Sequence, residues 1–240
     1  MKKMLILMLA STLVFAGSAE EIMDKATAAV LGNNGNKVID SLVFEATMSA
    51  PNGLNAKIMG IQAKGGKLYV KTNINMGSQE MEQVQGCDGV DCYEMNTMMG
   101  ARMLEGGEKS LLLSQHNLDG MADWRNTYTS AELLGEEDVN GEPCYKIKLV
   151  MDGDQHLVQY VSKKDYLVKR IDITVTSVMG EMAMSTYQTE YADFSGYTLP
   201  TKVTMEVMQQ QMTTTFTNYE FNSKVDDAKF QIPEQLKVAQ

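Results

Sequence analysis

The sequence predicts a mainly β (α+β) fold, with a single curved antiparallel sheet of about eleven strands. An N-terminal helix and short helices are expected to cover its concave face. Two observations support this class: apolar and polar residues alternate in most of the chain, and turn-forming residues separate the alternating segments. Open sheets beyond about ten strands tend to curl, split or flatten. We therefore expect a curled sheet with a concave apolar face.

The alternation is clearest between Cys144 and Val178, where two turns divide the segment into three strands. Lysines and other polar residues occupy every second position, as in strands with one buried face. The inward positions in the first and third strands are Tyr145, Ile147, Leu149, Ile171, Ile173 and Val175. This segment predicts an antiparallel meander whose apolar face needs a cover.

The other expected strands are residues 40–49, 57–63, 67–76, 79–85, 91–96, 182–193, 201–211 and 213–221. Residues 97–142 lose the alternation and contain the single Trp124. Within them, Ser110–Gln115 and Ser130–Leu134 are predicted to form short helices in a long irregular connection. Long connections in compact domains often serve as lids or binding loops.

The N-terminus has the features of a secretory signal peptide. Lys2 and Lys3 precede an apolar stretch, and small residues precede Glu20. We expect residues 1–19 to be removed by cleavage after Ala19 and residues 20–240 to form one domain in the periplasm. A membrane anchor is less well supported, because the apolar stretch is shorter than the roughly 20 residues of a spanning helix. Glu20–Leu31 then reads as an amphipathic helix that ends at a Gly-rich turn.

Acidity excludes two classes of partner. Removal of Lys2 and Lys3 shifts the formal net charge from −10 to −12. Nucleic acids and anionic membranes attract clustered Lys and Arg, so neither is expected as a partner. The acidity is also consistent with simple solubility of an exported protein.

Three cysteines occur in this chain. Cys87 and Cys92 flank a hairpin-like turn, so they are predicted to face each other and form a disulfide. Cys144 is then expected to be a small buried residue. The spacings match no usual zinc pattern, so no metal site is predicted.

Motifs for catalysis are sparse. His116 and His156 are the two histidines, and the sequence lacks nucleophile-elbow, zincin, phosphate-loop and dinucleotide-binding motifs. Acidic pairs such as Glu136-Glu137 and Asp226-Asp227 fall in turn-like stretches, where exposed carboxylates are usual. We predict no catalytic residue, no cofactor and no enzymatic activity.

Methionine is unusually frequent, with twenty residues in the chain. Flexible thioethers suit a surface that repacks around different apolar ligands. Methionine could equally replace leucine in an ordinary core. A third interpretation is Cu(I) binding by clustered thioethers, for which the candidate motifs are Met95-x-x-Met98-Met99 and Met179-x-x-Met182-x-Met184.

The order and spacing of several short motifs resemble the LolA/LolB-like outer-membrane lipoprotein-sorting superfamily. No one motif is specific, but together they extend over nearly the whole mature chain. They include residues 66–71 (GKLYVK), 87–89 (CDG) before Tyr93, 134–141 (LGEEDVNG), 144–147 (CYKI), 160–163 (YVSK), 167–170 (LVKR), 196–200 (GYTLP) and 225–230 (VDDAKF).

This resemblance implies a half-barrel with helices over its mouth and an apolar cavity for acyl chains. It further implies a periplasmic lipoprotein or lipid carrier, with an inner-membrane donor and an outer-membrane acceptor as partners. The lining is expected from the apolar strand faces, although each residue taken singly fits a packed core better. The candidates are Phe44, Met48, Val70, Ile74, Tyr145, Ile147, Leu149, Ile171, Ile173, Val175, Val203, Met205 and Val207.

Two features depart from the family's carriers and receptors. The family's carrier has an arginine on an early strand that bonds to the lid, whereas the first arginine here is Arg102, so that latch is not evident. The signal segment contains no cysteine for acylation, which argues against a lipoprotein receptor. An envelope sensor or partner-binding protein with the same fold is the alternative function, and a methionine-rich copper carrier is a third.

Overall fold

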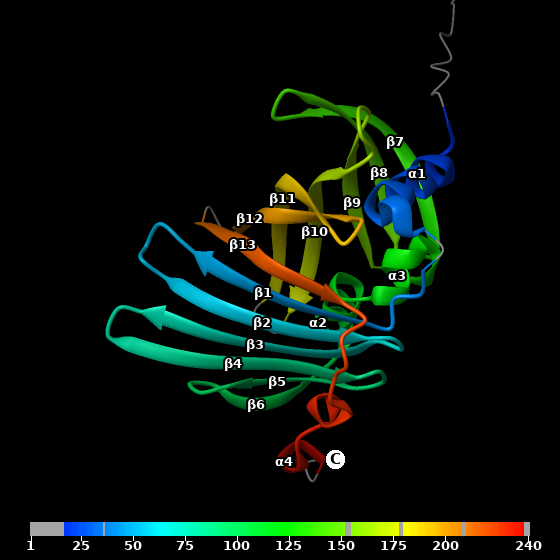
Figure 1. The fold of residues 1–240 in the computed structure, drawn as a ribbon. Helices are drawn as coiled ribbons and strands as arrows, with labels where there is room; N and C mark the ends of the chain where they lie inside the picture. The colour runs from blue at the N-terminus through cyan, green and yellow to red at the C-terminus, as the bar shows by residue number, and fades with distance from the viewer. Residues whose placement is uncertain (1–16, 36, 152–154, 178–179, 208–209, 238–240) are drawn as a thin grey trace, which may run out of the picture.

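The computed structural model describes residues 17–35, 37–151, 155–177, 180–207 and 210–237. All of its strands belong to one antiparallel sheet of 13 strands, in the order β6-β5-β4-β3-β2-β1-β13-β12-β11-β10-β9-β8-β7. The sheet therefore consists of two meanders, β1–β6 and β7–β13, that join where β1 pairs with β13. It curls strongly, so the two meanders face each other across a concave side (Figure 1).

The first meander contains β1 (Ser41–Ser49), β2 (Asn55–Ala63), β3 (Lys67–Met76), β4 (Gln79–Asp88), β5 (Cys92–Asn96) and β6 (Gly100–Leu104). The second contains β7 (Ser130–Val139), β8 (Glu142–Val150), β9 (His156–Ser162), β10 (Val168–Ser177), β11 (Gly180–Phe194), β12 (Tyr197–Val207) and β13 (Gln210–Phe221). The predicted mainly β fold with one antiparallel sheet is confirmed.

The expected number of about eleven strands is too low, because β6 and β7 were not predicted. The predicted helix at Ser130–Leu134 is wrong, since these residues begin β7. Its pairing with β8 shifts register between Leu133 and Gly135. This bulge leaves Leu134 exposed and interrupts the period of two. β6 is only five residues long, which is too short for a clear alternation.

Helix α1 (Ala19–Leu31) agrees closely with the predicted helix. Ser18 caps its first turn, and Ser18 and Glu21 form a reciprocal capping box. Ile22 and Met23 pack on the concave face of β7–β10 with Trp124. The helix ends at Gly32, which leads into η1 (Gly32–Asn34). Residues 1–16 lie outside the described residues, so the cleavage after Ala19 stays a prediction.

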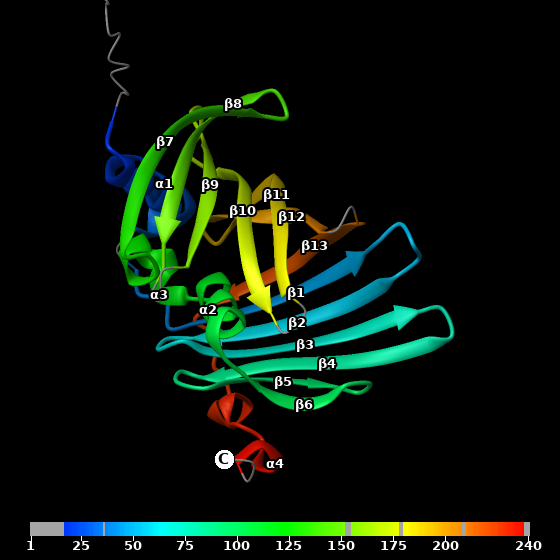
Figure 2. The same cartoon turned by 180° about the vertical axis from the view of Figure 1, so that it is seen from behind.

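Two further helices occupy the concave side, α2 (Gly106–Gln115) and α3 (Leu118–Ala122), followed by η2 (Trp124–Asn126). Figure 2 shows α2 in front of the sheet, between the two meanders. Leu111 packs against the cluster under α1, and Leu112 packs against Leu68 and Val70 on β3. Helix α2 therefore contacts both halves of the curled sheet. The predicted helix at Ser110–Gln115 is part of it.

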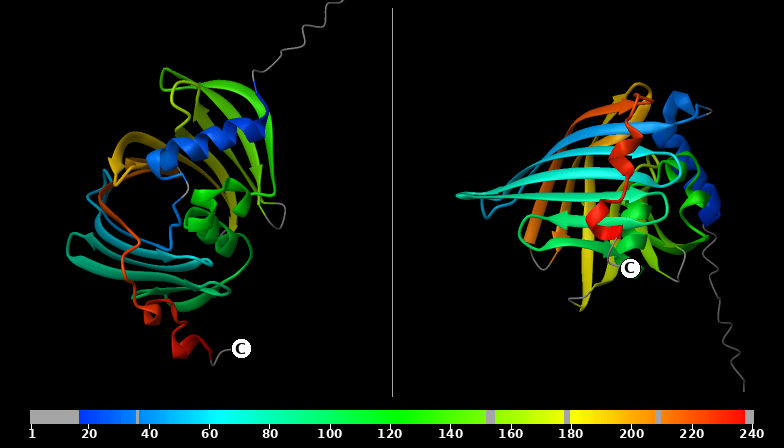
Figure 3. Two further views of the ribbon diagram at one scale, coloured as in Figure 1. Left: turned by 45° about the vertical axis from the view of Figure 1, so that its right-hand side comes forward. Right: turned by 90° about the horizontal axis from the view of Figure 1, so that it is seen from below.

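The C-terminal segment lies on the opposite face of the first meander (Figure 3). It forms η3 (Asp227–Phe230) and α4 (Glu234–Lys237). Ile232 and Leu236 pack against Val84 and Tyr93. Val84 on β4 and Tyr93 on β5 point away from the concave face. None of the described helices is long and apolar enough to cross a membrane.

Candidate functional site

A cavity of about 560 Å³ lies on the concave side, between the strands around the β1–β13 junction and the α2–α3 connection. Its size is within the range of small-molecule binding sites. None of the described lining residues carries a formal charge at neutral pH. The lining consists of Leu42, Phe44, Ile58, Gln62, Val70, Thr72, Gln85, His116, Asn117, Leu118, Met121, Gln188, Pro200, Val203, Met205, Thr214, Phe216 and Tyr219.

Aromatic side chains form one wall of this cavity. Phe44 points to the concave face from β1, and its ring occupies the space that a side chain at Gly60 on β2 would fill. Phe216 and Tyr219 of β13 lie beside it, with ring centroids 5.8 and 6.4 Å from that of Phe44. The Tyr219 hydroxyl donates to the Pro200 carbonyl at 3.0 Å. Burial raises the pKa of Tyr219, so its phenol stays neutral.

One polar pair lies at the helix-covered end of the cavity. The Gln62 amide, on a side chain that is 7% exposed, lies 2.8 Å from Nδ1 of His116. The imidazole is parallel to the Phe44 ring, with centroids 6.2 Å apart. Burial lowers the pKa of His116 to about 4, because the charged imidazolium would lose its hydration. The pair is therefore uncharged at neutral pH.

This lowered pKa predicts acid sensitivity. The unfolded chain binds a proton at His116 near pH 6.5, whereas the folded protein does so only near pH 4. The unfolded state thus holds more protons between these values, and stability is lost as the pH falls through this window, by about 2 to 3 kcal/mol. Urea unfolding at pH 7, 6, 5 and 4.5 should show this loss.

His116→Phe should flatten this part of the stability profile, since Phe keeps the stacking on Phe44 but does not titrate. His156→Gln is the matched control at the other histidine, which lies exposed at the start of β9, and should leave the slope unchanged. An unchanged slope in His116→Phe would contradict the prediction.

A second hollow, of about 680 Å³, lies further along the same strands, towards the hairpin tips. Its concave-face residues are Met48, Ala56, Ile74 and Met81, which are cross-strand neighbours on β1–β4. The other nine of its thirteen lining residues are polar or charged, among them Lys57, Glu80 and Glu82. Methionine and isoleucine thus extend the apolar surface beyond the first cavity.

The predicted lining residues fall into separate groups. Phe44, Val70, Val203 and Met205 line the cavity, and Met48 and Ile74 line the second hollow. Five others pack in the cluster under α1, namely Tyr145, Ile147, Leu149, Ile171 and Ile173. Val207 is partly buried on β12, and the side chain of Val175 lies outside the described part of the structure. Their binding of lipid stays a prediction.

Arg102 forms an ion pair between the sheet and a covering helix. Its guanidinium donates from β6 to the Glu108 carboxylate of α2 at 2.6 Å. Glu94 accepts hydrogen bonds from Gln83 and Gln85 and lies 3.8 Å from the same guanidinium. A sheet-to-helix arginine contact is therefore present, on β6 rather than on an early strand. The expectation concerned an arginine on an early strand, and it is unchanged by this contact from β6.

Arg102→Ala should loosen α2 without unfolding the protein. Partly exposed ion pairs contribute up to about 1 kcal/mol, so we expect a few-fold faster amide hydrogen exchange in α2. Lys202→Ala is a matched control, because Lys202 is equally exposed (43% each) and pairs with Glu190 of the neighbouring strand β11. Equal exchange rates in α2 for both variants would contradict a latch.

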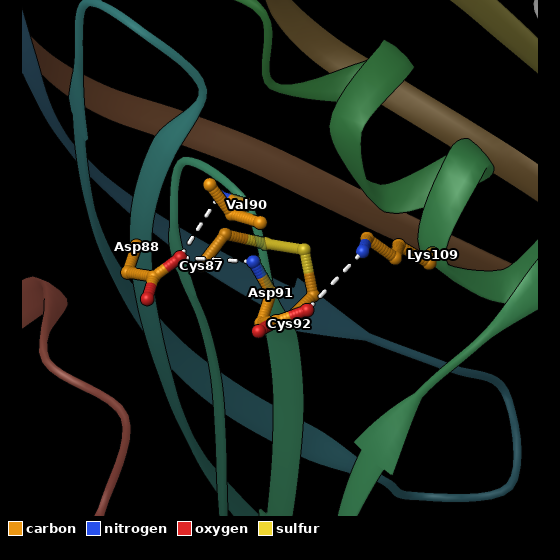
Figure 4. The surroundings of a disulfide bond; sticks show 6 residues. All are labelled: Cys87, Asp88, Val90, Asp91, Cys92 and Lys109. Atoms are coloured by element: carbon orange, nitrogen blue, oxygen red, sulfur yellow. Dashed lines mark hydrogen bonds and ion pairs between the residues drawn. A yellow bond between two sulfur atoms is a disulfide. The ribbon is translucent and has the colours of Figure 1, made fainter.

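Cys87 and Cys92 face each other in the β4–β5 hairpin and are joined by a disulfide (Figure 4). The Asp88 carboxylate accepts hydrogen bonds from the Val90 and Asp91 amides in the turn. Lys109 of α2 pairs with Asp91 at 3.5 Å. Cys144 is a free buried thiol among the described residues. The disulfide therefore lies directly beside the docking position of α2.

In the first methionine motif considered for copper, the three side chains do not converge. Met98 and Met99 are 64% and 80% exposed in the β5–β6 turn. Met95 packs near Ile232 on the opposite face, and Met179 lies outside the described residues. The described residues also contain no group of three or more His, Cys, Asp or Glu that could hold a metal.

Sequence reasoning did not find several cavity residues, among them Gln62, His116, Leu118 and Met121. His116, Leu118 and Met121 lie in the middle segment. The sequence of that segment has no periodicity that would assign these residues to a face. Gln62 lies on the same strand face as Ile58. The period of two along this strand is the sequence signal that places Gln62 on the inward face.

A comparison with protein-family models gives one match. A family described only as "Uncharacterized protein"-like matches residues 104–236, more than half of the chain. The chain belongs to this family. The matched range extends from the end of β6 to α4 and thus includes the covering helices and the whole second meander. No curated protein matches the sequence.

Solved structures share its fold. A LolA superfamily protein from Nitrosomonas europaea has 16% identity and a TM-score of 0.61, covering 90% of this chain and 99% of its own. A DUF1329 family protein from Desulfovibrio piger has 16% identity and a TM-score of 0.60, with 89% and 97% coverage. An outer-membrane lipoprotein-sorting domain from Vibrio parahaemolyticus has 11% identity and a TM-score of 0.57, with 88% and 95% coverage. The resemblance to the LolA-like superfamily is thus confirmed for the fold.

Proposed function

We propose that this member of the family is a non-enzymatic periplasmic carrier, exported with loss of residues 1–19, that shields lipid or lipoprotein acyl chains for transfer towards the outer membrane. The observation that carries this proposal is the uncharged cavity on the concave side, which is covered by α3 and its connection to α2. Met48, Ala56, Ile74 and Met81, on the concave face beyond this cavity, offer more surface for hydrocarbon.

The energetics favour shielding without chemistry. Each exposed methylene costs about 0.8 kcal/mol, so a chain of about fifteen methylenes costs about 12 kcal/mol in water. A cavity lined by Phe44, Val70 and Met205 offsets this cost without a nucleophile or a metal. The LolA-superfamily and lipoprotein-sorting neighbours support the same function through their shared fold.

A carrier of this kind needs a donor and an acceptor. We infer an inner-membrane protein that loads the cavity and an outer-membrane protein that unloads it. Helix α2 is suited to respond to such partners, because its sheet contacts combine an apolar cluster with the partly exposed Arg102–Glu108 and Lys109–Asp91 ion pairs.

Native mass spectrometry of the protein purified from the periplasm tests the proposal. We expect bound acyl species that disappear after organic extraction and rebind when lipid or a triacylated lipopeptide is added. The same spectrum gives the mass of the mature chain and so checks cleavage after Ala19. A protein that stays free of lipid in both experiments would contradict the carrier and favour the envelope sensor or partner-binding alternative.

A further inference from the structure

The cavity is not uniformly apolar, and Gln62, at one end, is the one lining residue among the buried polar residues of the described structure. Gln62 and His116 lie where β2 ends and α2 begins its connection to α3. Val203 and Met205 lie on β12, further along the cavity. An occupant therefore meets the Gln62–His116 pair at the first end. At the other end it meets Val203 and Met205, with the half-buried Gln188 and Thr214 on the strands beside Val203.

The Gln62–His116 pair has hydrogen-bonding capacity left after its own contact. If the Gln62 amide donates to Nδ1, the His116 Nε2–H donor and the Gln62 Oε1 acceptor have no partner among the described residues. If the amide is turned, the free groups are a Gln62 N–H donor and the His116 Nε2 acceptor. Either arrangement leaves at least one donor and one acceptor beside the cavity.

Two neighbouring polar residues of the lining, Asn117 and Gln85, already have partners in the fold. Asn117 caps α3 through Asp119 and donates to Thr127 and the Asn126 carbonyl. Gln85 donates to Glu94. Bare hydrocarbon at the polar end would leave the free donor and acceptor of the Gln62–His116 pair unpaired, which is costly in a dry site.

The absence of charged residues among the described lining residues is a second constraint on the ligand. The described lining contains no Lys, Arg, Asp or Glu, and a buried phosphate or carboxylate without a counter-charge is strongly unfavourable. A group with both acceptor and donor character but no charge fits the pair. The ester and hydroxyl groups of a diacylglycerol and the ester and amide groups of a lipoprotein's acylated N-terminus share this chemistry.

Resting on the proposed carrier function, we propose that Gln62 and His116 bind the uncharged ester or amide linkage of an acylated ligand. The acyl chains extend from this linkage towards Val203 and Met205. The cavity thereby selects neutral acylated ligands over anionic lipids and free fatty acids.

Competition binding tests this selectivity. Lipid-free mature protein is loaded with diphenylhexatriene, an uncharged hydrocarbon probe, and titrated with dioctanoylglycerol, dioctanoylphosphatidate, octanoate and a triacylated lipopeptide. We expect dioctanoylglycerol or the lipopeptide to bind at least tenfold more tightly than either anionic ligand. Tighter binding of the lipopeptide assigns the site to lipoproteins, and tighter binding of dioctanoylglycerol assigns it to a free neutral lipid.

Variants separate recognition from packing. Gln62→Met and His116→Phe keep similar volumes and should weaken dioctanoylglycerol or lipopeptide binding five- to tenfold, while diphenylhexatriene binding changes less than twofold. Gln211→Met is the matched control at an exposed position of β13 outside this lining, and it should change neither. An equal loss of the hydrocarbon probe, or equal affinity for dioctanoylphosphatidate, would overturn the inference while the carrier function stands. A wild-type protein that binds neither probe nor lipid would overturn both.

Discussion

Met205→Glu should abolish lipid binding and leave the sheet folded. Met205 lies partly buried on β12 and lines the uncharged cavity, so a carboxylate there keeps some hydration at a modest cost in stability. An acyl chain would have to dehydrate that carboxylate, and we expect affinity to fall by more than tenfold. Titration with diphenylhexatriene measures the loss, and circular dichroism checks the sheet.

The same change at Ile147 should unfold the protein. Ile147 is 0% exposed and packs under α1 in the cluster that contains Trp124. An unpaired buried carboxylate costs several kcal/mol, on the order of the whole stability of a domain. The fluorescence of the single Trp124 reports the loss directly.

A matched control for Met205→Glu is Met205→Gln, which keeps the size without the charge and should retain most of the binding. If Met205→Glu unfolds the protein, then Met205 belongs to the packed core. If Ile147→Glu stays folded and loses only lipid, then the cavity extends under α1, contrary to the structure.

The contrast between Met205 and Ile147 shows how far the sequence could predict the site. Both residues point to the concave face, and a period of two identifies that face correctly for both. Periodicity does not say what covers a face, however. Helix α1 fills the space above β8, whereas α2 and α3 leave a cavity above β1, β12 and β13. That difference depends on how the helices pack.

The sequence did not predict β7 or the position of His116, and each has a physical reason. In β7 the bulge at Leu134 moves later residues to the other face, so the alternation changes phase within one strand. The position of His116 depends on the end of α2 and on its contact with Gln62, more than fifty residues earlier. Contacts between residues so far apart in the sequence leave no local pattern in a single sequence.

Replacing both Cys87 and Cys92 by Ala should cost about 3 kcal/mol in the free energy of unfolding. Closing a loop of about six residues removes about 2 kcal/mol of chain entropy from the unfolded state, and two fully buried sulfur atoms also lose their packing against Leu112. Urea unfolding measures the loss. Cys144→Ala is the control, because Cys144 is a buried cysteine outside any disulfide and lies on the opposite face. Burial raises the pKa of its thiol to about 11, so it stays protonated.

The position of the disulfide predicts a second consequence, in the helix that covers the cavity. Helix α2 rests on the disulfide through Leu112 and on the hairpin turn through Lys109 and Asp91. Without the bond the hairpin end frays more readily, so α2 loses both supports at once. We expect faster hydrogen exchange in α2 and faster lipid release in the Cys87→Ala, Cys92→Ala protein. Lower stability with unchanged exchange in α2 would show that the disulfide stabilises the hairpin but does not hold the helix.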